Sequence, residues 1–300
     1  MDPLTHTLSG IVAGKLISKN KSLIWFVLVF SLLPDVDMFL LFHSKELFLT
    51  YHRGITHGIL FLFLLPLIPA IIFRKKFSFF PVYASSFLGY GLHILLDLTN
   101  QYGTRVLYPL DETAYNLSLT FIVDPYVILP LILALLISLK IKRGQRFLLI
   151  FSLILIAFYI GIKAYLKGEA KEFLKQRIEA HQYRVYPLPN DFARWWFVVR
   201  HSNEYITGVV DLFTKRVYID NKYTIKDNDL VLKSKESKSV KALLHFSKHP
   251  AFEIRKEGDV NVVIWRELSY AFLPEDRFTA KVWLKENPEG YKILNEKLKI

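Results

Sequence analysis

The sequence predicts an α-helical polytopic membrane domain of about five to six membrane segments, followed by a soluble α+β domain rich in antiparallel strands. Two observations predict this division. The 300 residues are 52% hydrophobic with a mean hydropathy of +0.26, which is too apolar for an ordinary soluble protein. Charge is concentrated later in the chain, since residues 1–166 hold only 14 of the 39 Lys and Arg and 8 of the 27 Asp and Glu. We therefore expect a membrane domain at 1–168 and a soluble domain at 169–300.

The first two apolar segments are irregular. Residues 4–18 are short for a span, so we expect a short or re-entrant helix with His6 near its start. Residues 22–43 are long enough to cross, but Pro34 and the two aspartates that follow it interrupt the run. A proline frees backbone groups and bends or ends a helix, which is tolerated where the helix lines a cavity.

Four further apolar runs have lengths near the ~17–25 residues of a span; they are 58–73, 79–97, 123–139 and 147–166. Basic clusters separate the runs: Lys19 and Lys21, then Arg74–Lys76, then Lys140, Lys142, Arg143 and Arg146. Placing these clusters in the cytoplasm follows the positive-inside rule and gives one consistent topology. All eight acids of residues 1–166, and the five histidines of that region, then fall toward the outer side.

The same topology places the second domain outside the cell. Residues 167–180 have apolar residues at helical spacing among charges, which predicts a short amphipathic helix continuing out of the membrane. Alternating and β-rich runs follow, and they predict strands at 183–187, 195–200, 205–212, 216–219, 260–268 and 278–284. A helix is expected at 238–247.

Three polar clusters interrupt the apolar sequence. They are Pro34–Asp37, His52–His57 and His93–Asp97. An ionisable group in a membrane-length segment is costly, so three such clusters indicate a site. The chain has no cysteine, which excludes thiolate ligands and leaves histidine and carboxylate as metal ligands.

Each cluster alone is a weak signal. His93 and Asp97 share one face of a helix because they are four residues apart, but a buried His–Asp pair without a metal has the same spacing. Asp35 and Asp37 can both turn into one cavity after the helix break at Pro34, or they can simply cap the break.

The segment between His52 and His57 can likewise be an interfacial loop that faces water. The combination is more specific, because histidines and aspartates from separate segments on one side of a membrane predict a His/carboxylate zinc or di-metal site. In this segment Thr56 can cap the next helix, and Arg53 can bind an anionic substrate oxygen.

The order of these motifs resembles the YdjM-like family of prokaryotic membrane-bound metal-dependent hydrolases, over about residues 1–170. The motifs are His6-Thr7, Pro34-Asp35-x-Asp37, His52-Arg53-Gly54-x-Thr56-His57, and His93-x-x-x-Asp97 with Gly103 soon after. The resemblance implies a multi-pass protein of the prokaryotic inner membrane with a His/Asp metal centre. The ligands that it implies are His6, Asp35, His52, His57, His93 and Asp97. Gly58 departs from the family, where a serine is expected.

The leading hypothesis is therefore a hydrolase at the outer face of the membrane. A metal-activated water would attack an ester or phosphoester, lipid-linked because a headgroup in the leaflet can reach the ends of the helices. Zinc is the first choice of divalent metal, with manganese or iron as alternatives. Arg53 would stabilise the developing charge, and Asp37 would act as general base or orient a ligand histidine.

Two other classes of function use the same residues. A metal transporter or a metal sensor could use the same ligands, but transport would need polar residues through to the cytoplasmic side, and 58–73 and 123–139 offer almost none. A non-catalytic scaffold would present the exported domain to a partner, with the His–Asp pairs serving only structure. We expect no nucleic-acid partner, because the topology places the basic second domain outside the cell. The expected partners are the lipid bilayer and a lipid substrate.

Overall fold

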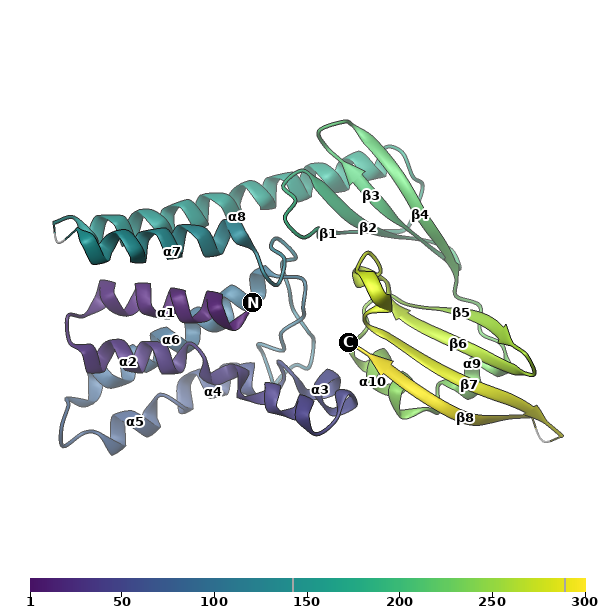
Figure 1. Ribbon diagram of the computed structural model, residues 1–300, viewed down its shortest axis with the longest axis horizontal. Coiled ribbons are helices and arrows are strands. Elements are labelled where there is room, and N and C mark those ends of the chain that lie inside the picture. The colour runs from purple at the N-terminus through teal and green to yellow at the C-terminus, as the bar shows by residue number, and fades with distance from the viewer. Residues whose placement is uncertain (142, 289) are drawn as a thin grey trace. The chain divides into compact units, whose positions relative to one another are not determined.

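The computed structural model describes residues 1–141, 143–288 and 290–300 (Figure 1). Lys142, a member of one expected basic cluster, lies outside the described residues. The chain forms two compact units. The first comprises residues 1–37, 53–166 and 187–192, and the second comprises residues 38–52, 167–186 and 193–300.

The N-terminal helices are short. Helix α1 (Pro3–Ile17) begins where the Asp2 carboxylate accepts a hydrogen bond from the Thr5 backbone N–H at 3.0 Å. Its 15 residues rise about 22 Å, less than the ~30 Å of a bilayer core. Helix α2 (Lys21–Phe30) ends before Pro34, and the 3₁₀ helix η1 (Leu33–Phe42) continues after a bend of 44°. The expected break near the proline is present.

Six further helices lead to the end of the membrane region: α3 (Lys45–Tyr51), α4 (Ile59–Leu64), α5 (Leu67–Ile72), α6 (Phe79–Thr99), α7 (Pro125–Lys140) and α8 (Gln145–Lys175). A one-turn 3₁₀ helix, η2 (Ile55–His57), precedes α4. The expected single segment at 58–73 is divided into α4 and α5 at Pro66, whose ring removes a backbone donor.

The expected count of five to six spans is not confirmed. Among the described residues, α6 and α8 are long and apolar enough to cross a membrane, and the count rises to four if each of two bent helix pairs is one span. The shorter α7 has 16 residues. In contrast, the 31 residues of α8 rise about 46 Å, so this helix extends beyond a bilayer core, as the expected helical extension at 167–180 requires.

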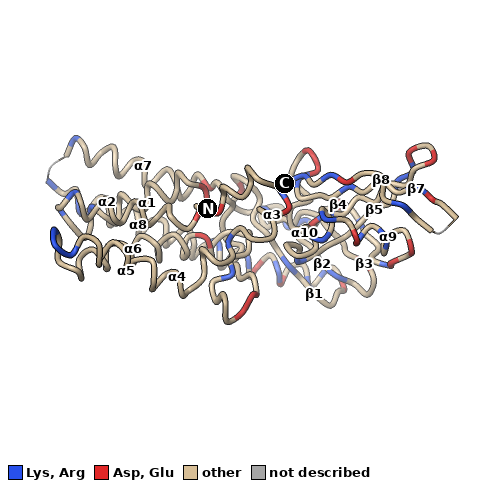
Figure 2. Tube along the Cα trace, turned by 90° about the horizontal axis from the view of Figure 1, so that it is seen from below, with Lys and Arg blue, Asp and Glu red and all other residues tan. Residues whose placement is uncertain are grey.

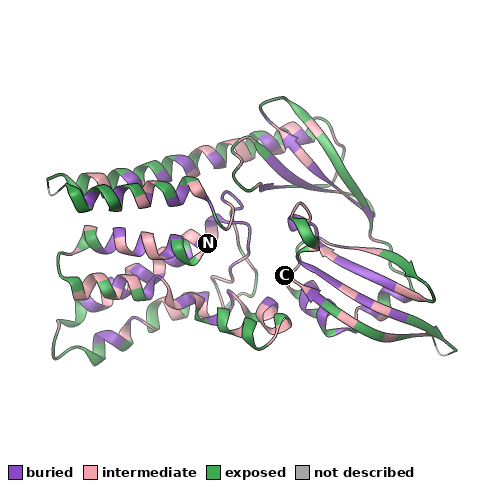
Figure 3. Ribbon diagram, viewed as in Figure 1, coloured by how far each residue is buried: buried purple, intermediate pink, exposed green. Residues whose placement is uncertain are grey.

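Close contacts between helices in the first unit depend on small residues. A Cβ atom at Gly89 of α6 would come within 2.2 Å of the Val27 carbonyl oxygen of α2, and one at Gly10 of α1 would come within 2.3 Å of Ser31 Oγ. The outward faces of α7 and α8 are exposed and apolar (Figure 3), as is typical of lipid-facing surfaces. These faces include Leu129, Leu133, Leu136, Phe151, Ile154 and Phe158.

Basic residues gather at one end of the helices of the first unit, at the turns before α2, α6 and α8 (Figure 2). Asp97 lies near the other end of α6. Because an α-helix rises about 1.5 Å per residue, Asp97 is about 27 Å along the axis from Phe79, which is close to the thickness of a bilayer core.

The second unit contains two four-stranded sheets, confirming the expected antiparallel, strand-rich domain. Their orders are β1(Gln182–Pro187)-β2(Arg194–His201)-β3(Glu204–Asp211)-β4(Arg216–Thr224) and β5(Pro250–Glu257)-β6(Val260–Glu267)-β7(Thr279–Asn287)-β8(Gly290–Lys299). Two helices lie between the sheets in sequence, α9 (Asp229–Ser234) and α10 (Lys238–Phe246). Strands β5 and β8 were not expected, because their apolar residues are sparse and largely exposed.

Buried tryptophans organise this unit. The indole N–H of Trp265 on β6 donates to Ser234 Oγ at the end of α9, at 2.8 Å. The indole N–H of Trp196 on β2 donates to the Leu268 carbonyl at 2.8 Å. A buried indole requires such a partner, so these bonds fix the position of each ring.

Candidate metal centre

Helix α6 carries two members of the site on one face, as their spacing predicts. His93 Nε2 lies 3.3 Å from Asp97 Oδ2, and both side chains are fully buried. The close approach of α6 to α2 at Gly89 sets this face against the segment that contains Asp35. Because i and i+4 side chains lie above one another, the pair presents its ligand atoms in one direction.

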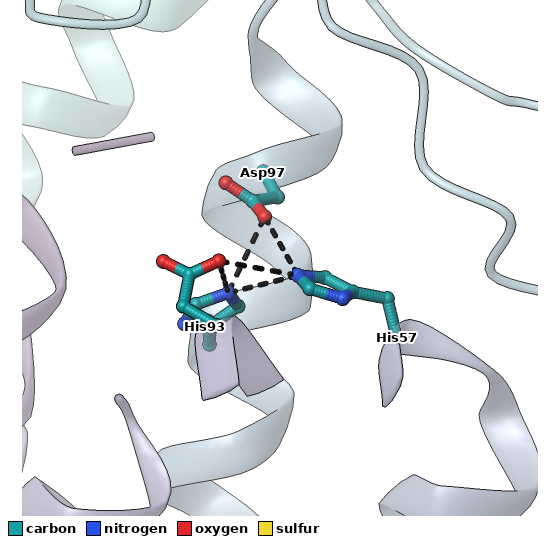
Figure 4. Close-up of side chains that lie close together, drawn as sticks. His57, His93 and Asp97 are labelled. Atoms are coloured by element: carbon teal, nitrogen blue, oxygen red, sulfur yellow. Dashed lines mark hydrogen bonds and ion pairs between the residues drawn. The ribbon is translucent and has the colours of Figure 1, made fainter. Parts of the chain in front are cut away.

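The 3₁₀ helix η2 contributes His57. Its Nε2 atom lies 3.1 Å from His93 Nε2 and 3.2 Å from Asp97 Oδ2 (Figure 4). The next residue, Gly58, is the N-cap of α4, and a Cβ atom there would come within 2.6 Å of the Tyr108 carbonyl oxygen. The tight packing of the backbone explains the glycine at a position where the family resemblance suggests serine.

The fourth ligand atom comes from η1, after the bend at the end of α2. Asp35 Oδ1 lies 3.7 Å from His57 Nε2 and 3.6 Å from His93 Nε2. The ligand atoms of Asp35, His57, His93 and Asp97 all lie within 4.8 Å of one another. Three segments that are far apart in sequence therefore place two imidazole nitrogens and two carboxylate oxygens around one point.

The spacing of these four atoms fits a tetrahedral metal ion. Zinc binds histidine nitrogen and carboxylate oxygen at about 2.0–2.2 Å, so the edges of a zinc tetrahedron are about 3.4 Å long. The five distances given above range from 3.1 to 3.7 Å. The donor set therefore fits zinc, and its nitrogen and oxygen atoms also suit manganese or iron.

Hydrogen bonds assign the tautomer of each histidine. His93 Nδ1 lies 2.8 Å from the Ser31 carbonyl oxygen, which can only accept, so Nδ1 carries the proton. His57 Nδ1 lies 3.0 Å from Thr56 Oγ1, and the Thr56 hydroxyl donates to Asp37 Oδ2 at 2.7 Å. His57 Nδ1 is therefore the donor to Thr56. Both Nε2 atoms then direct lone pairs into the cluster, the form that binds a metal.

The second oxygen of Asp97 is held by cationic groups. Arg53 Nη2 donates to Asp97 Oδ1 at 2.7 Å, and the amino group of Met1 contacts the same oxygen. Arg53 also donates through Nη1 to Asn100 Oδ1 at 3.2 Å and to the Tyr102 carbonyl at 3.3 Å. A buried carboxylate requires such compensation. The buried guanidinium thus orients Asp97, and its action on a substrate oxygen stays a prediction.

Asp37 holds the loop that carries His57. Its Oδ2 accepts from the Arg53 backbone N–H at 2.9 Å and from the Thr56 hydroxyl. Arg53 adopts a left-handed backbone conformation with φ of 57°, which is costly for a non-glycine residue. Asp37 therefore stabilises a strained turn and, through Thr56, the orientation of His57. Its role as general base stays a prediction.

The two remaining expected ligands lie in different surroundings. The ring of His6 stacks on His93 with centroids 3.7 Å apart, and its Nε2 lies 3.3 Å from Asp97 Oδ1. Its two ring nitrogens are buried without a hydrogen bond to any described residue. His52 belongs to the second unit, where it is the C-cap of α3. Its ring stacks on that of Phe48, with 4.5 Å between the ring centroids. Its role as a ligand stays a prediction.

Three residues that support the site were not expected from the sequence. Ser31 acts through its carbonyl oxygen, for which a sequence carries no signal. Tyr90 lies about one helical turn before His93, and its hydroxyl donates to the Thr56 carbonyl oxygen. Asn100 was detectable, because a polar residue three positions after Asp97 at the end of an apolar run is unusual.

Comparisons with known proteins place the chain in a family. The family model of the YdjM inner membrane protein matches residues 1–170. The uncharacterized protein YfhP of Bacillus subtilis (strain 168) is 24% identical over 294 residues, which cover 90% of this chain and 87% of that protein. No solved structure matches. The matched region contains the whole candidate metal centre and more than half of the chain, so the chain belongs to the YdjM inner membrane protein family.

Proposed function

We propose that this protein is a membrane-bound, metal-dependent hydrolase of esters or phosphoesters, and that its metal is zinc. One observation carries the proposal: Asp35, His57, His93 and Asp97 direct two nitrogens and two oxygens to one point at tetrahedral spacing. Histidine and carboxylate are the ligands of hydrolytic zinc sites, which also keep one coordination position for water, so hydrolysis here would require a fifth position or the release of one carboxylate. Manganese and iron are the alternatives that the same donor atoms accept.

In this proposal some residues would hold the metal and others would orient those ligands. Asp35, His57, His93 and Asp97 would hold the metal, and His6 stands beside them as a further ligand. When bound, such a metal lowers the pKa of a coordinated water and polarises an ester oxygen. The Ser31 carbonyl and the Thr56 hydroxyl keep the imidazoles in the metal-binding tautomer, and Arg53 fixes the orientation of Asp97.

The position of the candidate metal centre along the helices supports a site at the outer face of the membrane and a substrate that is linked to a lipid. Asp97 is about 27 Å along α6 from Phe79, which follows a basic turn. If that basic end faces the cytoplasm, as the charge rule predicts, the cluster lies at the opposite interface, where a lipid headgroup can reach it. The second unit then follows α8 on the extracytoplasmic side. An enzymatic reporter fused at residue 168 tests this orientation, and activity of that fusion in the cytoplasm would overturn it.

The first test of the site is metal content. Elemental mass spectrometry on detergent-purified protein should find stoichiometric metal in the wild type, and less than about a tenth of it in His57→Ala and His93→Ala. His43→Ala is the matched control, because His43 is exposed and lies outside the cluster, and it should keep its metal. Folding of each variant is checked by its elution volume and thermal unfolding.

The second test is activity. Wild-type protein should hydrolyse a fluorogenic phosphodiester or an ester lipid in mixed micelles, and the two histidine variants should not. Stoichiometric metal without hydrolysis of any ester lipid would favour a metal transporter or sensor. No metal after reconstitution with zinc or manganese would favour a scaffold in which the clusters serve only structure.

A further inference from the structure

A cavity of about 610 Å³ opens at the basic end of the first unit, away from the metal centre. The end of α1 and the turn after it form one wall, and the first turn of α8 forms the other. Nothing in the proposed hydrolytic site uses this cavity.

The charge of the lining is of one sign. Three cationic side chains, those of Lys15, Lys19 and Arg146, line the cavity, and its described lining contains no carboxylate. The two lysines are exposed, so their ammonium groups can move onto a ligand. Three cations that converge without a counter-ion attract an anion.

The walls of the cavity are held in place by specific contacts. Arg146 Nη2 donates to the Leu16 carbonyl at 3.0 Å, which joins the start of α8 to the end of α1. The turn after α1 is fixed by the Ser18 hydroxyl, which accepts from the Asn20 backbone N–H at 3.0 Å. The fold therefore sets the position of Arg146 and of the turn that precedes Lys19.

The rest of the lining is apolar. The aliphatic residues are Leu16 and Ile17 of α1, Ile24 of α2 and Leu149 of α8. Ile17 is 51% exposed, so an acyl chain can pack on it. A site that combines three cationic side chains with aliphatic ones matches an amphiphile with an anionic head.

We propose that this cavity binds the phosphate group of an anionic glycerophospholipid, with Lys15, Lys19 and Arg146 around the phosphate and Ile17 against an acyl chain. Each basic side chain near an anionic headgroup contributes about a fivefold gain in affinity. Because three are present, phosphatidylglycerol should bind roughly 100-fold more tightly than it would to the same cavity without them.

The test is native mass spectrometry of the full-length protein in detergent, titrated with phosphatidylglycerol or with phosphatidylcholine. The double variant Lys15→Gln/Lys19→Gln should lose about 25-fold in affinity for phosphatidylglycerol and much less for phosphatidylcholine, whose choline ammonium already offsets the phosphate charge. These exposed lysines make no described contact that the fold needs, whereas Arg146→Gln also removes the bond to Leu16. The double variant is therefore the primary probe.

The matched control is Lys75→Gln/Lys76→Gln, which removes the same charge from another basic turn at the same end of the helices but outside the cavity. It should keep wild-type affinity for phosphatidylglycerol. Equal losses in the two double variants would overturn the proposal, because they would show attraction to the basic surface as a whole. Competition by millimolar inorganic phosphate would show that the phosphate group alone fills the site, and the absence of competition would assign it to the intact lipid.

Discussion

His57 and His93 face each other through Nε2 atoms 3.1 Å apart, while the Nδ1 atom of each is a hydrogen-bond donor on the other side of its ring. Two lone pairs at this distance repel each other. The carboxylate oxygens of Asp35 and Asp97 add further negative potential at the same point. A divalent cation, as proposed above, would convert this repulsion into four favourable bonds.

The Thr56 hydroxyl should tune the affinity for the metal without touching it. Thr56→Val removes the acceptor for His57 Nδ1–H and the donor to Asp37 at nearly constant volume. We expect metal affinity to fall about 10- to 100-fold, as is typical when the partner of a ligand histidine is lost. Competition with a chromophoric chelator measures the metal affinity of each protein. Thr56→Ser keeps the hydroxyl and should restore most of the affinity, and equal affinity in Val and Ser variants would contradict this role.

Metal binding should also stabilise the fold. A ligand present at about 100 times its Kd, and bound only by the native state, adds about 2.7 kcal/mol to the free energy of unfolding. We therefore expect added zinc to raise the Tm of chelator-treated wild-type protein in detergent. His93→Ala removes one of the four ligands, so its Tm should not respond to zinc. A zinc-dependent rise of equal size in that variant would place the metal elsewhere.

The contact between α2 and α6 should be sensitive to a single methyl group. In Gly89→Ala the new Cβ would lie 2.2 Å from the Val27 carbonyl oxygen, so the helices must separate. Overpacking of this kind costs about 1–3 kcal/mol, and it should also weaken metal binding because Asp35 follows α2. Tm and metal content measure the two effects. Gly161→Ala in α8 is the control, since its Cβ meets nothing within 4 Å and alanine favours a helix.

The second unit should lose stability in mild acid. His249 is buried against the Tyr186 hydroxyl, with 2.7 Å between Oη and Nε2, and burial lowers its pKa below the usual 6.5. The nearby Arg184 and Lys248 lower this pKa further, whereas Glu267 acts in the opposite direction. A histidine whose pKa is lower in the native state gives its full stabilisation above pH 6.5. That stabilisation falls as the pH drops from 6.5 toward the native-state pKa.

Hydrogen–deuterium exchange of β1 and β6 between pH 7.5 and pH 5 measures this effect, after correction for the intrinsic exchange rate. Local opening should become more frequent in the wild type as the pH falls, and less so in His249→Gln, which cannot titrate. His201→Gln, at an exposed site on β2, should keep the wild-type dependence. A wild-type profile in His249→Gln would assign the acid sensitivity to another group.

Local patterns predicted the elements that depend on local physics. The spacing of His93 and Asp97 predicted one helical face, and both lie on α6 with 3.3 Å between ligand atoms. Pro34 predicted the break after α2, because a proline cannot continue the hydrogen-bond ladder. Alternation predicted the antiparallel domain but missed β5 and β8, whose side chains are largely exposed.

Tertiary packing decided the rest. Residue types and motif order in the sequence by itself determined membership of a membrane family and a set of candidate metal ligands. The fold selected Asp35, His57, His93 and Asp97 for one cluster, because their meeting depends on contacts between η1, η2 and α6 that no local pattern encodes. The fold also directs the Arg53 guanidinium to Asp97, whereas the sequence suggested contact with a substrate oxygen. The reason is that a buried carboxylate needs a cation nearby. The division of residues 58–73 into α4 and α5 at Pro66 was likewise decided by the fold, because hydropathy alone counts that run as continuous.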